Sequence, residues 1–239
     1  MKNIIYSALT TCALTCIPIG NALSGTVGQG TWETTLQGRD LDGNLSNGFE
    51  AYYDTTLDIS WLADANLPKT QGLPSNGEMN WLAANNWAQN LNLGGVTGWR
   101  LPTMDDFGSN GCTSWSSSGG SGKDCGYNVD TTASELAHLY YVTLGNSANL
   151  SGGFSLTNTG PFKNVAPYNY WSNEENGYYH GGQAWYFSTY NGHQFSYLKT
   201  TPYNVWAVHD GDVSPVPEPT SLALVLMGLS VLALRYRRT

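Results

Sequence analysis

The chain has 239 residues and a formal net charge of −8, with nine tryptophans and fifteen tyrosines but only 12% charged side chains. When the basic residues near the two ends (Lys2, Arg235, Arg237 and Arg238) are set aside, residues 23–219 keep six basic against eighteen acidic side chains, a net charge of −12. Such a charge disfavours nucleic acid and anionic polysaccharides as partners, and the length fits one globular domain between short terminal segments.

The first 22 residues have the order of an export signal. Lys2 supplies a positive start, Ile4 to Ile19 form an apolar region, and Gly20-Asn21-Ala22 offers small residues for cleavage after Ala22. The sequence therefore predicts a signal helix over residues 1–22 and an exported domain over residues 23–213.

The exported domain begins with a pattern typical of short strands. Apolar and polar residues alternate over 31–36, 51–54 and 57–62, and Gly43-Asn44 offers a turn between the first two strands.

Asp40, Asp42 and Asn44 have the spacing that opens a calcium-binding EF-hand loop. That loop needs a glycine at its sixth position and a bidentate glutamate at its twelfth, where this chain has Leu45 and Ala51. We therefore expect no EF-hand here.

Two helices are expected in the middle of the domain. The first is predicted from the capping box Ser75-x-x-Glu78 to Gly94, and the second from Thr132-x-x-Glu135 to Gly145. Their apolar faces are Trp81, Ala84, Ala88 and Leu91 in the first and Leu136, Leu139, Tyr140 and Leu144 in the second.

Strands return after the second helix. We expect them at 170–172, 183–188 and 205–208, with Asn-Gly turns at 176–177 and 191–192. Strands, two helices and further strands predict an α+β domain in which the helices pack on antiparallel sheet.

Two cysteines, Cys112 and Cys125, remain once the signal segment with Cys12 and Cys16 is removed. An exported protein meets oxidising conditions, so we expect a disulfide between them. A zinc site would need four ligands, and no histidine or second cysteine pair lies nearby in the sequence.

The last 24 residues combine three features. Val216-Pro217-Glu218-Pro219 precedes an apolar run from Leu222 to Leu234, and the basic residues Arg235, Arg237 and Arg238 follow it. From Thr220 to Leu234 a helix would rise roughly 22 Å, short of the ~30 Å hydrocarbon core, but flanking arginines and Tyr236 extend its reach. The pattern predicts a transmembrane helix with its C-terminus in the cytoplasm.

This three-part order resembles the PEP-CTERM sorting signal of Gram-negative bacteria that make exopolysaccharide. The resemblance covers about the last 25 residues. It implies recognition by an exosortase, a membrane transpeptidase or protease, which cuts near Pro-Glu-Pro and discards the helix. The implied destination is the cell surface or extracellular matrix, after a stage in the inner membrane.

A second resemblance is carried by Trp99, Arg100, Leu101, Pro102 and Thr103, which follow the first predicted helix. It is similar to the Lcl C-terminal domain family, whose molecular role is unknown. Further phrases in the same order extend the resemblance over about residues 50–213: Tyr53-Asp54, Trp61 to Asn66, Glu135 to Tyr140, Tyr170 to Ser172, Ala184 to Phe187 and Trp206 to Val208. The family usually ends in Val-Arg, where this chain has Val208-His209.

The residues of this motif have structural roles of their own. Pro102 restricts Leu101 to an extended conformation, and Thr103 is suited to cap a following helical turn. We expect Arg100 to be held by a carboxylate, with Asp64 and Asp105 as the candidates.

The phrase Arg-Leu-Pro-Thr also occurs in formylglycine-generating enzymes, which have a variant of the C-type-lectin-like fold. This resemblance implies a lectin-like architecture for the single α+β domain. It does not extend to the activity, because formylglycine generation depends on a cysteine pair in the C-terminal part and this chain has no cysteine after Cys125.

We predict a non-catalytic protein that binds or organises exopolysaccharide. Aromatic rings stack on the apolar faces of sugars, and the proposed stacking residues are Trp171, Trp185, Tyr186 and Trp206. A lectin-type calcium site is a further possibility, with ligands drawn from Asn173, Glu174, Glu175, Asn176, Asp210 and Asp212.

Two other functions stay open on the sequence alone: a hydrolase or oxidase acting in the matrix, and a purely structural surface protein. Facing carboxylates in a cleft would favour the hydrolase, and an open strip of aromatic rings would favour binding. Glu174 and Glu175 are adjacent, so in an extended chain their side chains diverge.

Overall fold

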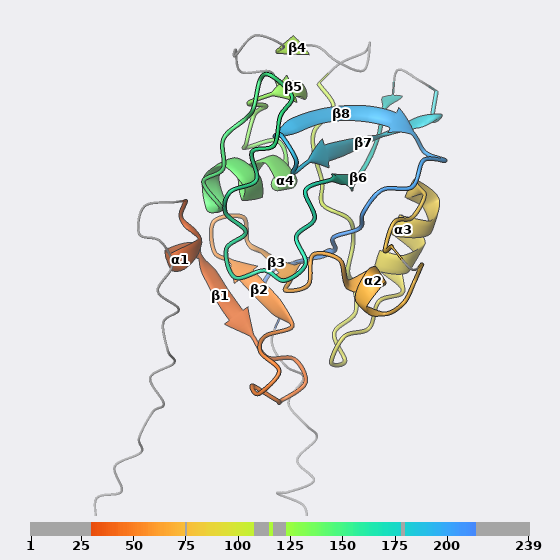
Figure 1. Cartoon of the computed structure of the whole chain (residues 1–239). Coiled ribbons are helices and arrows are strands. Elements are labelled where there is room, and N and C mark those ends of the chain that lie inside the picture. The colour runs from red at the N-terminus through yellow and green to blue at the C-terminus, as the bar shows by residue number, and fades with distance from the viewer. Residues whose placement is uncertain (1–29, 75, 108–114, 117–122, 178–179, 214–239) are drawn as a thin grey trace, which may run out of the picture.

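The computed structural model describes residues 30–74, 76–107, 115–116, 123–177 and 180–213 (Figure 1). Among these residues, no helix combines the length and the apolar character needed to cross a bilayer. The predicted signal helix, the predicted transmembrane helix at Leu222 to Leu234, the sorting motif and Cys112 lie outside the described residues. Cys125 is buried, and its disulfide with Cys112 stays a prediction.

The strands form two small sheets. The first has the order β1-β2-β3-β9 and is antiparallel throughout, with bounds Leu36–Arg39, Ala51–Asp54, Ile59–Leu62 and Val208–Asp210. The second has the order β4-β5-β8-β7-β6, with bounds Trp115–Ser116, Cys125–Tyr127, His193–Leu198, Gln183–Ser188 and Asn169–Glu175. Only the short β4–β5 pair is parallel among these pairings. The second sheet lies above the first in Figure 1.

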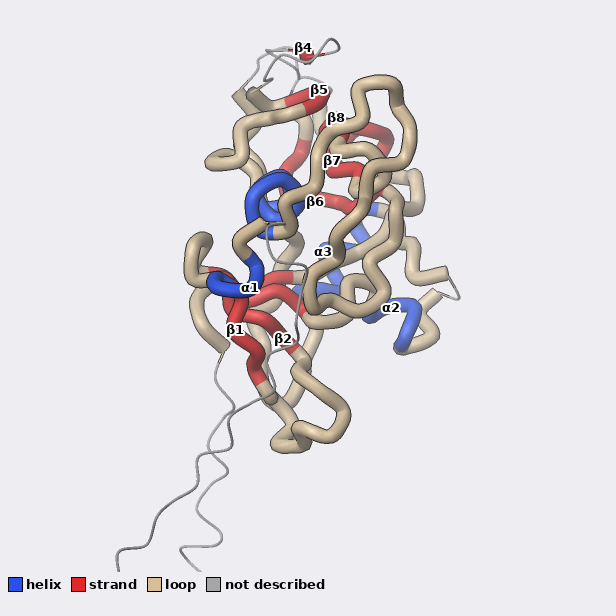
Figure 2. The backbone as a smooth tube through the Cα atoms, turned by 60° about the vertical axis from the view of Figure 1, so that its left-hand side comes forward, coloured by secondary structure: helices blue, strands red, loops and turns tan. Residues whose placement is uncertain are grey.

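The helices are short and lie around the strands, and loops make up much of the tube in Figure 2. They are α1, α2, α3 and α4, with bounds Trp32–Thr35, Leu67–Thr70, Trp81–Gln89 and Glu135–His138, and a π-helical turn, η1, continues α4 over Leu139–Thr143. The domain is therefore α+β, as predicted.

The core between the sheets is aromatic. The Trp206 ring meets Trp61 at 5.3 Å and Phe162 at 4.9 Å between ring centroids, both edge to face. Its indole N–H donates to the carbonyl of Leu62 at 2.8 Å, which satisfies the one polar group of this side chain. A chain with few charged residues thus uses its tryptophans to build the interior.

The first long helix begins later than predicted, because Met79 is held in an extended conformation. The N–H and carbonyl of Met79 bond to Tyr203 at 2.8 and 3.0 Å, so a helix cannot include it. Asn80 caps α3 instead, accepting from the N–H of Ala83 at 2.9 Å, and Glu78 is bonded to Asn76. The helix ends at Gln89, before the predicted stop at Gly94.

The second predicted helix is present, but its cap differs. Thr132 bonds to Asp130, and Ser134 accepts from the N–H of Ala137 at 3.3 Å in its place. The helix then continues as η1, and Gly145 has the positive φ (66°) of the predicted stop.

The strand predictions are confirmed at β2, β6 and β7, confirmed in part at β3, and wrong at two other segments. Residues 32–35 form α1, a helical turn in which the N–H groups of Thr34 and Thr35 donate to the carbonyl of Thr31 at 2.9 and 3.0 Å. Of residues 205–208, only Val208 belongs to a strand, and all four side chains are buried. Their apolar character therefore reflects burial on all sides and not strand alternation.

Arg100 links three parts of the fold. Its guanidinium donates to both oxygens of Glu135 at 2.8 Å and to Asp210 at 2.6 and 2.8 Å. Its backbone bonds twice to Val208 at 2.8 Å, which places the side chain between α4 and β9. The expectation of Asp64 or Asp105 as its partner was wrong: Asp64 instead binds Thr70 and Asn164.

The same carboxylate holds both ends of the Arg-Leu-Pro-Thr turn. Glu135 accepts from the N–H of Thr103 at 2.7 Å while it holds Arg100. Burial alone would lower the pKa of Arg100, but the hydrogen bonds that it donates to Glu135 and Asp210 outweigh it and raise that pKa. The guanidinium is therefore charged wherever the domain is folded.

Replacing Arg100 with glutamine is expected to destabilise the domain by about 2–3 kcal/mol, because Glu135 is then left partly buried without its cation. The melting temperature should fall by roughly 5–10 °C. The matched control is Arg39→Gln, which removes the pair with the more exposed Asp212 and should cost about 1 kcal/mol or less. Equal losses in thermal unfolding would contradict the linking role of Arg100.

Candidate functional site

The three tryptophans predicted to stack on sugars are core residues. Trp171, Trp185 and Trp206 are 0–1% exposed, so neither face of any ring is open to a ligand. Trp171 donates its indole N–H to Met79, and Trp185 donates to Asp106. The burial does not support the assignment of these residues to a binding site: Trp171 and Trp185 lie in stretches of strand covered on both faces, and Trp206 packs in the core just before β9.

Tyr186 is also unavailable as an open platform. It is half-buried, and the ring of Tyr203 lies 5.0 Å away, edge to face. Burial raises the pKa of its phenol, with smaller contributions from Tyr203 and Tyr197. The predicted stacking set therefore offers no exposed ring face.

The residues predicted for a calcium site are not brought together. Asn176 is buried and donates to Ser196, and Asn173 is exposed and contributes its backbone N–H to Pro102. Three of the four acidic members are engaged elsewhere by cations: Glu175 by Lys199, Asp210 by Arg100 and Asp212 by Arg39. These three carboxylates therefore form ion pairs within the domain instead of a shared cation site.

Glu174, which is exposed, is the one acidic residue of the predicted calcium set that has no ion pair with a lysine or arginine in the described part of the chain. Burial, and after it the charges of Asp106, Asp105 and Glu175, raise its pKa. A carboxylate whose pKa is raised in the folded state opposes folding once it is ionised, and this penalty disappears below the unfolded pKa of about 4.3.

Glu174→Gln is accordingly expected to stabilise the domain at pH 7 by roughly a few tenths of a kcal/mol, and to have no effect near pH 4. The control is Glu175→Gln, which removes the ion pair with Lys199 at 2.5 Å and should not raise stability. Melting temperatures across pH 4–8 test both variants. A stabilisation by Glu174→Gln that is the same at both ends of the range would contradict this account.

A pocket of about 450 Å³ opens where the β1–β2 loop meets three other segments. The loop contributes one wall, residues 62–70 contribute another, and Lys163 and Asn164 close it. Its polar lining is Asp42, Asn47, Glu50, Asp64, Thr70, Lys163 and Asn164, and its apolar lining is Phe49, Leu62, Ala63, Leu67 and Leu93. The volume is within the range of small-ligand sites.

The Phe49 wall depends on a glycine. A Cβ on Gly38 would lie 2.2 Å from the Phe49 ring, so a side chain at that position would displace it. Tyr52 meets the same ring edge to face at 5.9 Å. Phe49 is thus held at the pocket with 37% of its surface exposed.

The polar wall is arranged by hydrogen bonds between the segments. Asp64 accepts from Thr70 at 2.5 Å and from Asn164 at 3.0 Å. Lys163 donates to the carbonyl of Asn47 at 3.0 Å, which ties the β1–β2 loop to the opposite side. These groups are oriented before any ligand arrives.

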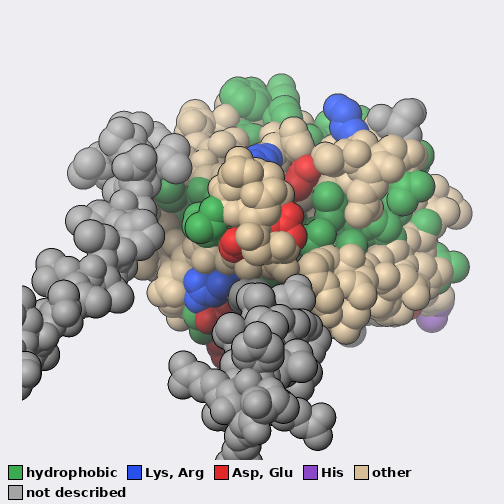
Figure 3. Space-filling view, turned by 90° about the horizontal axis from the view of Figure 1, so that it is seen from below, with side chains coloured by type: hydrophobic (Ala, Val, Ile, Leu, Met, Phe, Trp, Pro, Cys, Tyr) green, Lys and Arg blue, Asp and Glu red, His purple; other side chains and the backbone are tan. Residues whose placement is uncertain are grey.

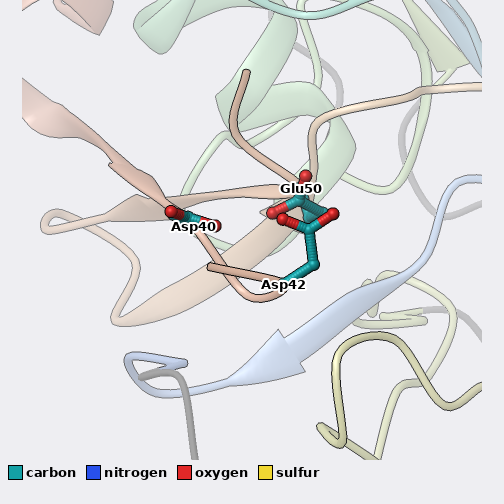
Figure 4. A group of neighbouring side chains, drawn as sticks. All are labelled: Asp40, Asp42 and Glu50. Atoms are coloured by element: carbon teal, nitrogen blue, oxygen red, sulfur yellow. The ribbon is translucent and has the colours of Figure 1, made fainter. Parts of the chain in front are cut away.

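Three carboxylates gather on the β1–β2 loop (Figure 4), and two of them, Asp42 and Glu50, line the pocket. One oxygen from each of Asp40, Asp42 and Glu50 lies within 4.8 Å of the others, the one such trio within the described ranges. Asp40 accepts a hydrogen bond from the backbone N–H of Gly43, and Glu50 accepts one from the backbone N–H of Leu41, each at 2.8 Å. Figure 3 shows acidic and basic side chains adjacent to one another on the lower face.

Asp42 is ionised at neutral pH. The hydrogen bond from Asn47, followed by that from the N–H of Asn44, lowers its pKa. A carboxyl group in this state accepts hydrogen bonds but is a poor proton donor.

A second exposed feature, which we call the aromatic patch, consists of Phe154, Tyr168 and Tyr190. These rings are 54%, 51% and 40% exposed, and Phe154 meets Tyr190 at 5.8 Å. Tyr168 and Tyr190 flank a hollow of about 270 Å³. The sequence signal was available: Pro167 precedes Tyr168 and the Asn-Gly turn follows Tyr190, and aromatic residues at turns stay outside the core.

The Lcl C-terminal domain model matches residues 50–209, about two thirds of the chain, and covers both sheets apart from β1 and the last residue of β9. The chain belongs to the Lcl C-terminal domain family. The aromatic patch lies inside the matched residues of this Lcl domain, whereas Asp42, Asn47 and Phe49 of the pocket precede them. No curated protein and no solved structure matches the chain.

The tail, residues 215–238, matches the PEP-CTERM protein-sorting motif, as predicted. This motif indicates an exported protein that is sorted by exosortase to the surface of a Gram-negative bacterium. The partner of the tail is thus an exosortase.

Proposed function

We propose that this Lcl domain is a non-catalytic glycan-binding module, which holds exopolysaccharide at the cell surface through the pocket beside the β1–β2 loop. We also propose a lectin-like architecture, on the basis of the Arg-Leu-Pro-Thr resemblance. The small antiparallel sheets with short helices around them agree with it.

The observation that carries the proposal is the mixture of groups in the pocket. Sugar hydroxyls both donate and accept hydrogen bonds, and the pocket offers carboxylate oxygens, amide groups and the ammonium of Lys163. The exposed part of the Phe49 ring suits the apolar face of a sugar ring.

The charge of the pocket limits the class of glycan. Asp42, Glu50 and Asp64 face a single cation, Lys163. Uronic acids and sulfated sugars would meet like charge, so the proposal names neutral sugars.

A matrix hydrolase remains the second candidate, because the carboxylates of Asp40, Asp42 and Glu50 are as close as those of some glycosidases. A glycosidase also needs a carboxyl group that keeps its proton near neutral pH. The lowered pKa of Asp42 makes it unsuited to be that acid, although an ionised carboxylate is what the second member of such a pair requires. Release of shorter sugars from exopolysaccharide decides between cleavage and binding.

Phe49→Ala is expected to weaken glycan binding about tenfold, because it removes the apolar wall while the polar groups stay. The native protein, isolated from the surface of its host, is applied to a glycan array and to purified host exopolysaccharide. Phe107→Ala is the matched control, since this phenylalanine is 44% exposed and lies outside the pocket lining. Equal binding by both variants would overturn the assignment of the pocket.

The same array separates the alternatives. Release of shorter sugars from exopolysaccharide would support the hydrolase. Binding that requires calcium and is lost in Asp42→Asn would place a cation at the carboxylate trio. Binding that is unchanged by chelator supports direct recognition. No binding under any condition favours a purely structural role.

Cleavage of the sorting tail would change the mass of the mature protein. If exosortase cuts near Pro217-Glu218-Pro219, the mature surface protein lacks the arginines at 235, 237 and 238. Mass spectrometry of the native protein should therefore find a C-terminus close to residue 219 and an N-terminus at residue 23. An intact Arg237-Arg238 end would contradict processing.

A further inference from the structure

We propose that the aromatic patch of Phe154, Tyr168 and Tyr190 is a second glycan subsite, which binds a neutral stretch of the same polysaccharide outside the pocket. This inference rests on the proposed function and deepens it by adding a place for a longer chain.

The first argument is the composition of the hollow. It is lined by Pro167, Tyr168, Asn169, Ser188 and Tyr190, none of which carries a charge at neutral pH. Two tyrosine rings flank it, and a phenol combines an apolar face with a hydroxyl that both donates and accepts. An uncharged sugar chain has the same combination of apolar C–H faces and hydroxyl groups.

The second argument is that the patch is rigid. Thr189 is buried, and its hydroxyl donates to the carbonyl of Ala166 at 2.6 Å. The same hydroxyl accepts from the N–H of Tyr168 at 3.1 Å. The N–H of Thr189 donates to the carbonyl of Tyr168 at 2.9 Å. These bonds fix the two tyrosines relative to each other, so a ligand that rests on both rings orders little backbone.

The base of the patch is also pinned to the core. The hydroxyl of Tyr170, a fully buried residue, accepts from the N–H of Ala166 at 2.8 Å. On the other side, Ser155 donates its N–H to the carbonyl of Tyr190 at 2.8 Å, and so brings Phe154 against the Tyr190 ring.

The third argument concerns charge. The patch belongs to a chain whose residues 23–219 carry a net charge of −12, which repels anionic polymers. The hollow offers no cation to compensate, so a neutral polysaccharide is the occupant that both the local and the overall charge allow.

The fourth argument is the position of the patch along the chain. Asn164 lines the pocket and Pro167 lines the hollow, three residues further on. Three residues span at most about 11 Å. A polymer of several sugars is therefore long enough to occupy both places, whereas a disaccharide fills one.

The test compares short and long ligands. Neutral fragments of the host exopolysaccharide are separated into disaccharides and into chains of about ten sugars or more, and their binding to the native protein is measured by calorimetry. Tyr168→Ala and Tyr190→Ala should weaken the binding of long chains about five- to tenfold and leave disaccharide binding unchanged. Tyr190→Phe, which keeps the ring, should retain most of the affinity.

Tyr197→Ala is the matched control, since this tyrosine is 47% exposed and lies outside the hollow. Thermal unfolding shows whether each variant is folded before binding is compared. Long-chain binding that is unaffected by the Tyr168 and Tyr190 variants, while Phe49→Ala weakens both ligand lengths, overturns the second subsite and leaves the pocket standing. Wild-type protein that binds no fragment overturns the proposed function and this inference with it.

Discussion

The ion pair between Arg100 and Glu135 is the constraint on which the rest of the domain depends. Glu135 opens α4, while the backbone of Arg100 is bonded to Val208 beside the first sheet. One carboxylate therefore holds a helix, a sheet edge and the Leu101-Pro102-Thr103 turn in a single arrangement. A guanidinium suits this role because its planar fork bonds two carboxylates at once and is charged at any pH at which the domain folds.

Around this link the domain is filled with aromatic side chains, and this choice explains where its binding surfaces can lie. Tryptophans on strands point inward and pair through ring contacts, as Trp61 does with Trp206. The exposed rings of Phe49 and Tyr168 come from loops, whereas the exposed Tyr197 lies on β8. Candidate recognition surfaces in this fold are thus built on connections between strands, which the packed core holds in place.

The sequence predicted that aromatic residues form the candidate binding surface, but not which aromatic residues are exposed there. Aromatic content pointed to sugar stacking, yet Trp171 and Trp185 are core residues because their strands are covered on both faces at these positions. The pocket was missed because its walls come from segments far apart in the chain, such as the β1–β2 loop and Asn164. The carboxylates rejected as an EF-hand do lie together, but through a turn that the EF-hand pattern does not describe.

The sequence by itself determined the family, the α+β class and the sorting tail, because motifs and apolar periodicity are local properties of the chain. It also placed β2 and β7 with the bounds that the structure has. Only the tertiary structure decided the partner of Arg100, the start of α3 and the residues that are open to a ligand. Each depends on contacts between distant segments, as when the pairing of Met79 with Tyr203 delays the helix, and such contacts leave no periodic trace in the sequence.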